Sequence, residues 1–261
     1  MLSSREALLK SAVLCHTNAV LDLHCHILPA VDDGSSSWEM SLEMGRCLVE
    51  AGFTVIAPSP HYGTGPGGDV SMEVAEAKRG EIRELFEREG IELEILPNAE
   101  HHVSPMLFDR LKEGAVVPIG GVGKWLLVEL PWSPMVKPEE ILFRLQMSGH
   151  RLLLAHPERY NYLEVDTVER LVERGVKLQL ELGSCVGVYG RRSKKRARLF
   201  ADKGWSHVIA SDLHRPETWL GDALKAVEKR YGTAGLKKAL EENPQAILSD
   251  IDTEQLEPFL S

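Results

Sequence analysis

Seven short apolar runs recur along this chain, and most of them end at or next to a histidine, an aspartate or a glutamate. The runs cover residues 20–24, 53–57, 92–96, 125–128, 151–155, 176–182 and 207–210. Stretches with helical periodicity alternate with them, at 38–51, 70–89, 138–148, 165–174, 191–202 and from 217 to the end, where Asn243-Pro244 predicts a break. This alternation is typical of parallel βα units and predicts an α/β fold.

The polar residues lie where the predicted strands end, which predicts the side of the sheet they occupy. The carboxyl ends of parallel strands meet at one face, and barrel enzymes carry their active sites there. No linker or shift in composition divides residues 1–261, so we predict one domain with residues 1–18 as an N-terminal extension. Periodicity alone is compatible with a closed barrel and with an open doubly wound sheet.

Charge and cysteine content argue against several classes of protein. The 39 acidic residues outnumber the 30 basic ones, and the net charge of −9 disfavours a general binder of nucleic acid or membrane surfaces. No apolar stretch approaches the roughly 18 residues of a membrane span, so we expect no stable membrane insertion. Cys15, Cys25, Cys47 and Cys185 form no CxxC pair and predict reduced thiols in a cytoplasmic protein.

His24 and His26 begin a set of side chains suited to binding metal ions. Residues two apart on a strand point to the same face, so the two imidazoles are expected side by side. The candidate ligands are His24, His26, Asp33, His61, Glu100, Glu129, His156, Asp212 and His214. Nitrogen and oxygen ligands without cysteine suit Mn²⁺, Fe²⁺ or Zn²⁺ and do not choose among them.

Six segments around these candidates resemble the motifs of a known superfamily. They are Asp22-Leu23-His24-Cys25-His26, Val31-Asp32-Asp33-Gly34, Ser59-Pro60-His61, Ala99-Glu100, Leu154-Ala155-His156-Pro157-Glu158-Arg159-Tyr160 and Ser211-Asp212-Leu213-His214. In order and spacing they resemble the PHP (polymerase and histidinol phosphatase) superfamily. The closest likeness is to its bacterial branch of metal-dependent protein-tyrosine phosphatases linked to capsule and exopolysaccharide synthesis.

The resemblance implies a distorted (β/α)7 TIM-like barrel with three divalent metal ions, among which Mn²⁺ is favoured. In the implied assignment His24, His26, Glu100 and Asp212 hold one metal, Asp33, His61 and His214 hold a second, Glu129 and His156 hold a third, and Glu100 bridges. Asp33 is preferred to Asp32 because the superfamily's ligand is the aspartate next to glycine. The sequence by itself does not separate the two aspartates.

The resemblance also implies an activity, which is hydrolysis of phosphotyrosine by attack of a metal-bound hydroxide on phosphorus. Adjacent divalent ions lower the pKa of bound water and hold the attacking and leaving oxygens. Arg159 and Arg215 are the expected phosphate-binding side chains, with a salt bridge at the rim as the alternative role. The expected partner is a phosphotyrosine protein or peptide tail, such as that of a bacterial tyrosine kinase, and a homo-oligomer stays open.

Four other interpretations remain at this point. The same site could serve a small-molecule phosphatase such as histidinol phosphatase, or the barrel could be a catalytically silent binding protein. The segment from Cys185 to Arg191 fits the Cys-x5-Arg pattern of cysteine-based phosphatases. The basic run 191–198 is either a solvated helix face or a surface that attracts an acidic or phosphorylated peptide.

Two features near the predicted ligands have no assigned role in the sequence. His101 and His102 follow Glu100 and are expected at the rim or behind the ligands. The glycine-rich loop 63–68 is either a lid over the site or a surface connection.

Overall fold

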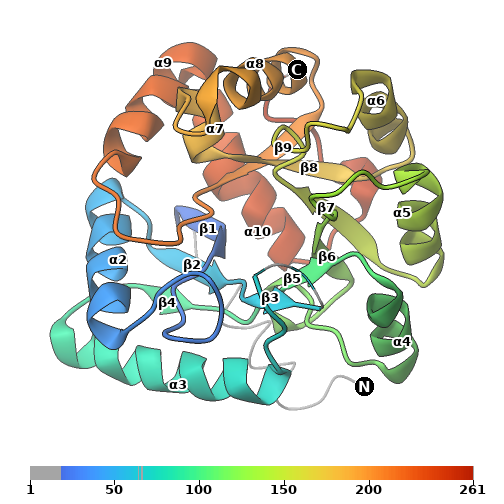
Figure 1. Cartoon of the computed structure of the whole chain (residues 1–261). Coiled ribbons are helices and arrows are strands. Elements are labelled where there is room, and N and C mark those ends of the chain that lie inside the picture. Colours follow the sequence, from blue (N-terminus) through green and yellow to red (C-terminus); the bar gives the residue numbers. More distant parts are fainter. Residues whose placement is uncertain (1–18, 64, 66, 261) are drawn as a thin grey trace.

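The computed structural model describes residues 19–63, 65 and 67–260 (Figure 1), so the predicted extension 1–18 lies outside the described residues. The strands are β1 Leu21–Cys25, β2 Val55–Pro58, β3 His61–Tyr62, β4 Glu94–Ile95, β5 Glu100–His102, β6 Trp125–Glu129, β7 Arg151–Ala155, β8 Lys177–Glu181 and β9 Ser206–Ala210. The α-helices are α2 Trp38–Ala51, α3 Met72–Glu89, α4 Pro105–Glu113, α5 Pro138–Met147, α6 Val165–Glu173, α7 Leu182–Val186, α8 Gly190–Asp202, α9 Leu220–Lys237 and α10 Asn243–Leu248. Shorter helical turns span Ile119–Gly121, Lys238–Glu242 and Thr253–Gln255.

The strands form two parallel sheets that together describe a distorted barrel. One sheet has the order β1-β2-β4 and the other the order β3-β5-β6-β7-β8-β9. Ser59 and Pro60 separate β2 from β3, and β4 and β5 are separated by a segment containing Pro97, so each pair continues one interrupted strand. Proline has no N–H to donate to a ladder, which accounts for interruptions at these points.

The barrel closes between its first and last strands. The backbone N–H of His26 donates to the carbonyl of Leu213 at 2.8 Å, and Cys25 forms a parallel bridge with Leu213. With the two interrupted strands counted once each, the described residues provide seven strand positions. The predicted distorted (β/α)7 barrel is therefore confirmed, and the open doubly wound sheet is excluded.

Local signals explain why several elements lie where the sequence predicts them. The hydroxyl of Ser37 accepts a hydrogen bond from the N–H of Met40 and caps α2, and Gly52 ends the helix with φ of 101°. Helix α3 begins at Met72, two residues later than predicted, because Ser71 caps its first turn. No helix in the described part of the chain is long and apolar enough to cross a membrane.

Three parts of the secondary structure differ from the prediction. Helix α4 follows β5 without having been predicted, and α7 begins at Leu182, where the predicted strand 176–182 was still running. At Asn243-Pro244, where a break is expected, helix α10 begins, and the backbone stays right-handed helical from Lys237 through Asn243. Proline is tolerated there because it lies in the first turn of α10. An irregularity that was not predicted lies at Gly232, with φ of 78° and ψ of 162°.

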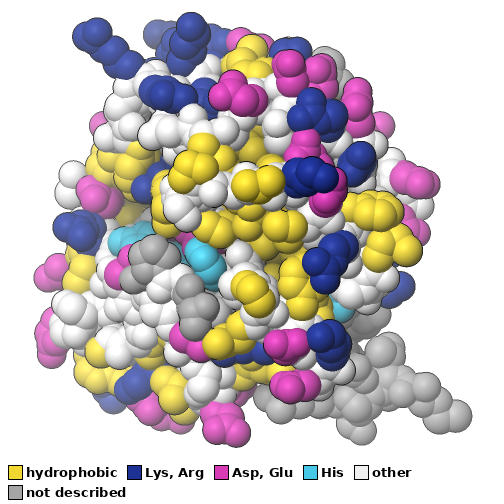
Figure 2. All heavy atoms as spheres, turned by 45° about the vertical axis from the view of Figure 1, so that its right-hand side comes forward, with side chains coloured by type: hydrophobic (Ala, Val, Ile, Leu, Met, Phe, Trp, Pro, Cys, Tyr) yellow, Lys and Arg dark blue, Asp and Glu magenta, His cyan; other side chains and the backbone are white. Residues whose placement is uncertain are grey.

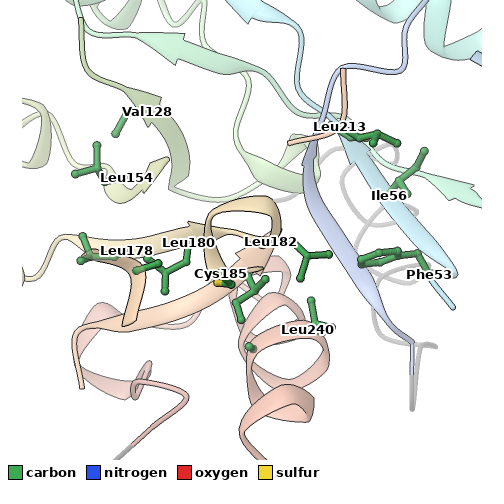
Figure 3. Packing of buried hydrophobic residues seen from close by; sticks show 14 of the residues in the cluster. Phe53, Ile56, Val128, Leu154, Leu178, Leu180, Leu182, Cys185, Leu213 and Leu240 are labelled. Carbon is green, nitrogen blue, oxygen red and sulfur yellow. The ribbon is translucent and has the colours of Figure 1, made fainter. Parts of the chain in front are cut away.

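Two hydrophobic clusters build the framework that positions the strand ends. One joins the strands to the surrounding helices and includes Phe53, Leu180 and Leu240 (Figure 3). The other contains residues of β1, β2, β6, β7 and β9 together with Ile247 and Leu248 of α10. Burial of this apolar surface, at about 25 cal/mol per Å², holds the strand ends rigidly enough to carry a preorganised site.

Candidate metal centre

Most of the predicted ligands lie at or close to the carboxyl ends of strands, whereas Asp33 lies in the loop that follows β1. His24 lies within β1, Glu129 is the last residue of β6, and His156 directly follows β7. Because every strand pairing is parallel, these ends meet on one side of the barrel. Seven of the nine residues are buried, His214 is partly buried, and Asp33 is exposed.

His24, His26 and Asp212 form one group of converging ligand atoms. The Nε2 atoms of the two histidines lie 3.2 Å apart, and Oδ1 of Asp212 lies 3.2 Å and 3.4 Å from them. The other ring nitrogen of each histidine is held by a polar neighbour. Nδ1 of His24 lies 3.0 Å from Oε1 of Gln179, and Nδ1 of His26 lies 2.8 Å from Oδ2 of Asp32. Such contacts orient an imidazole for a metal.

Glu100 lies at the centre of the site. Its Oε1 is 3.4 Å from Nε2 of His24 and 3.1 Å from Nε2 of His156. Its Oε2 is 3.5 Å from Nε2 of His26 and 3.1 Å from Nδ1 of His61. One carboxylate thus faces four imidazoles through two oxygens, which is the arrangement of a bridging ligand.

The structure distinguishes the two adjacent aspartates by their contacts. Oδ1 of Asp33 lies 3.2 Å from Nε2 of His61 and 3.4 Å from Nε2 of His214, and these residues group with His26 as candidate ligands. Asp32 instead contacts Nδ1 of His26 and accepts a hydrogen bond from the N–H of Gly34. The geometry therefore favours Asp33 as a ligand and Asp32 as the residue that orients His26.

Glu129 and His156 are arranged differently from the implied assignment. They do not share a candidate group among the described residues: Glu129 groups with His61 and Glu100, whereas His156 groups with His24 and Glu100. Glu129 also has Oε2 at 3.1 Å from Nδ1 of His102. Glu100 is therefore the common member of both groups.

The charges of the site compensate one another in the protein without bound metal. Burial alone lowers the pKa of His61, but Asp33 and Glu100 outweigh it and raise that pKa to about 10. The imidazoles of His214 and His61 in turn hold the pKa of Asp33 below its ordinary range. Metal ions need neutral imidazoles, so metal binding must displace protons from this site and strengthens as the pH rises.

Buried polar atoms without a partner test whether a metal suits this pocket. Nδ1 of His61 and Oδ1 of Asp212 are buried, and their short contacts with neighbouring candidate ligands lack the geometry of hydrogen bonds. A buried polar atom left in this state is costly unless something else satisfies it. The donor set of imidazoles and carboxylates fits divalent cations. The residues present therefore fit metal ions.

Two candidate ligands have a backbone conformation that is rare for residues other than glycine. His156 has φ of 36° and Asp212 has φ of 50°. The N–H of Asp212 donates to the carbonyl of His24 at 2.8 Å and helps to keep this conformation. Such conformations cost about 1–3 kcal/mol each and concentrate at functional sites.

Glycines allow the backbone to approach the ligands closely. A Cβ at Gly34 would lie 2.2 Å from the carbonyl oxygen of His26, and one at Gly67 would lie 1.8 Å from Cδ2 of His61. A Cβ at Gly65 would lie 2.9 Å from Nδ1 of His102. Gly65 and Gly67 of the glycine-rich loop therefore pack against His102 and His61, and a side chain at either position would clash with them.

We expect Gly67→Ala to lower any metal-dependent activity of this site about 10- to 100-fold, because the added methyl group displaces the imidazole of His61. Metal content per chain, measured by mass spectrometry, should fall in parallel. Gly80→Ala in α3 is the matched control, because a Cβ there meets nothing within 4 Å. Equal metal content and activity in the two variants would contradict this account of the loop.

Arg159 is held at the edge of the metal centre by four neighbours. Its NH1 donates to Oδ2 of Asp212 at 3.0 Å and lies 3.3 Å from Oε2 of Glu181. The guanidinium lies over the ring of Tyr189, 4.3 Å from its centroid, and over that of Trp132 at 4.9 Å. These contacts immobilise the guanidinium and leave it facing the cavity.

A cavity of about 580 Å³ opens above these residues and is lined by Asp33, His61, Glu100, Glu129, Trp132, His156, Arg159, Tyr189, Asp212, His214, Arg215 and Trp219, among others. Arg215 is exposed at its rim. Figure 2 shows histidine side chains reaching the surface beside acidic groups on one face of the molecule. The cavity has room for a phosphate ester with an aromatic group.

Sequence reasoning missed the residues that support the ligands. Gln179 orients His24, and Glu181 and Tyr189 hold Arg159. A signal for the first two was available, since Gln179 and Glu181 are polar residues at alternate positions of an otherwise apolar run. Trp132 and Tyr189 lie in connecting segments, where the sequence has no comparable pattern.

The cysteine-based alternative finds no support in the structure. Cys185 lies in α7 among leucine side chains, including Leu180 and Leu182 (Figure 3), and Arg191 lies exposed on α8. Burial raises the pKa of the Cys185 thiol, which disfavours the reactive thiolate.

His101 points away from the candidate ligands, because its Nδ1 contacts the carbonyl oxygen of Leu127 at 2.9 Å.

Comparison with known proteins places these observations in one family. The model of the family described as "Capsular polysaccharide synthesis, CpsB/CapC" matches residues 20–249. Tyrosine-protein phosphatase YwqE of Bacillus subtilis is 30% identical over 235 residues, covering 88% of this chain and 91% of that protein. Tyrosine-protein phosphatase CpsB of Streptococcus pneumoniae is 27% identical over 242 residues, covering 88% and 99%.

Solved structures agree with the sequence comparison. A structure from work on YwqE of Bacillus subtilis and CpsB of Streptococcus pneumoniae, described there as metal-dependent tyrosine phosphatases, aligns with a TM-score of 0.80, 29% identity and coverage of 88% of this chain and 94% of that one. The phosphotriesterase homology protein of Escherichia coli aligns with a TM-score of 0.57 at 12% identity, covering 88% and 98%, and shares the fold. The resemblance found in the sequence is confirmed, and the chain belongs to the CpsB/CapC family.

Proposed function

We propose that this protein is a metal-dependent protein-tyrosine phosphatase with the nine predicted ligands and Arg159 as its active site. The observation that carries the proposal is geometric. Each of the four overlapping groups of ligand atoms contributes at least one residue to the lining of one cavity, which the immobilised guanidinium of Arg159 also lines. Such a set suits hydrolysis of a phosphate monoester, and the named activities of the relatives YwqE and CpsB point to tyrosine phosphate.

Different side chains of the site bind the metal ions, the phosphoryl group and the aromatic ring of the substrate. The groups share His24, His26, His61 and Glu100, so fewer ions than groups are needed, and we propose three. When bound, divalent ions supply charge neutralisation and a water of lowered pKa. Arg159 binds phosphoryl oxygens, and Glu181 keeps its guanidinium in place. The rings of Trp132, Tyr189 and Trp219 line the cavity and favour an aromatic phosphate ester.

Chelation is the experiment that tests the proposal. We expect a chelator to abolish turnover of p-nitrophenyl phosphate, and added Mn²⁺, Fe²⁺ or Zn²⁺ to restore it, with Mn²⁺ expected to be the most effective. Cys185→Ser should retain activity within about twofold, because the buried thiol lies in the core. Activity that survives chelation and disappears in Cys185→Ser would overturn the metal-dependent reaction.

The physiological substrate we propose is a phosphotyrosine protein of polysaccharide synthesis, such as a bacterial tyrosine kinase, in the cytoplasm. The family description supports the pathway. The free thiols of Cys25, Cys47 and Cys185 support a reducing compartment. Turnover of phosphotyrosine peptides against histidinol phosphate separates this substrate class from the small-molecule alternative.

A further inference from the structure

Helix α8 carries six basic side chains, although the net charge of the chain is −9. They lie between Arg191 and Arg198 of α8, and Asp202 is the only acidic residue of that helix. The first turn has no acidic residue and the last turn has no basic one. A helix dipole favours the opposite distribution, so stabilisation of the helix does not account for these charges.

Half of these side chains have structural roles. Each donates to a backbone carbonyl 2.7 Å away: Arg192 to Asn161, Lys194 to Val186 and Arg196 to Leu163. Asn161 and Leu163 lie in the segment between β7 and α6 that also contains Arg159, and Val186 is the last residue of α7. The structural roles leave three basic residues of the helix to be explained.

Arg191, Lys195 and Arg198 form the α8 basic face. Their spacing of four and three residues puts them on the same side of the helix, and all three are exposed. None of them forms an ion pair with a described carboxylate, whereas Asp202 is already paired with Arg230 at 2.8 Å. The face borders a shallow cavity of about 440 Å³. Lysines and arginines gather at the top of Figure 2, where Figure 1 places α8.

The α8 basic face begins two residues after a residue that lines the metal cavity. Tyr189, which lines that cavity and stacks on Arg159, is separated from Arg191 by a single residue. Seven residues of helix from Arg191 to Arg198 span roughly 10 Å at 1.5 Å per residue. An extended peptide covers that distance with about three residues. A peptide leaving the cavity on this side therefore meets the three charges within a few residues.

We propose that the α8 basic face docks an acidic segment next to the phosphotyrosine of the protein substrate. This inference rests on the proposed function and names the chemistry of its substrate. The chain as a whole is acidic and so is the cavity lining, and the face supplies a local positive potential that attracts acidic side chains. Its continuity with the cavity favours a peptide over an anionic membrane.

Binding of a synthetic peptide tests this inference without requiring turnover. The probe carries a non-hydrolysable phosphonate in place of phosphotyrosine, followed by three glutamates, and its partner peptide has three glutamines instead. Fluorescence anisotropy at physiological salt should show that Lys195→Glu with Arg198→Glu raises Kd for the acidic peptide on the order of 10-fold. Kd for the glutamine peptide should stay within about twofold.

Lys225→Glu with Lys229→Glu is the matched control. It makes the same change of charge as Lys195→Glu with Arg198→Glu, but on another helix, α9, and at two positions four residues apart. Both double variants should turn over p-nitrophenyl phosphate like the parent. If the unsubstituted protein does not hydrolyse p-nitrophenyl phosphate, the proposed function is refuted. The docking proposal is still tested in that case, because peptide binding is measured without turnover. Unchanged affinity for the acidic peptide, equal loss for both peptides, or loss only of binding to phosphatidylglycerol vesicles would overturn the docking surface.

Discussion

Glu100→Gln is expected to lower kcat/KM for p-nitrophenyl phosphate on the order of 1,000-fold, or about 4 kcal/mol of transition-state stabilisation. The reason is the central position of this carboxylate, whose two oxygens face four imidazoles within 3.5 Å. The amide that replaces it has no negative charge and one oxygen in place of two. Metal content per chain should fall with the activity.

The matched control is Glu84→Gln on the exposed side of α3, which should leave metal content and activity unchanged. Circular dichroism separates loss of metal from loss of fold. A Glu100→Gln protein with full metal content and parental turnover would show that this carboxylate does not bridge metals.

Arg159→Lys is expected to lower kcat/KM about 100-fold while metal content stays at the parental value. Lysine keeps the positive charge but lacks the planar fork that binds two phosphoryl oxygens. It also cannot occupy the space between the rings of Trp132 and Tyr189 in the same way. Inhibition by inorganic phosphate should weaken together with catalysis.

Arg230→Lys is the control, because Arg230 pairs with Asp202 on the surface, away from the metal cavity. Arg215→Ala should have a smaller effect than Arg159→Lys, since Arg215 is exposed at the rim. Parental activity and phosphate inhibition in Arg159→Lys would assign this arginine to structure alone.

Elements with strong local signals could be predicted from sequence. Helix α2 has the predicted limits because Ser37 caps its first turn and Gly52 ends it. The limits of β7, a mainly apolar run, were also predicted. Helix α7 could not be predicted, because Leu182 continues the apolar pattern of β8 and only its packing turns the chain into a helix. The helical continuity through Pro244 likewise depends on its position in a first turn.

The sequence by itself determined the chemistry available at the site. The alternation of strands and helices and the polar residues at the strand ends predicted a parallel sheet with histidines and carboxylates at one face. That conclusion needs only the periodicity of the chain and the rule that parallel strands end together.

Only the tertiary structure decided which of these side chains lie next to one another. It placed Asp33 beside His61 and Asp32 beside His26, surrounded Glu100 with four imidazoles, and packed Arg159 against two aromatic rings. Distances of about 3 Å between residues more than a hundred positions apart, such as His24 and Gln179 or His24 and Asp212, depend on barrel closure and on the loops that cross its end. Sequence spacing contains no information on such distances, because they are set by packing across the whole fold.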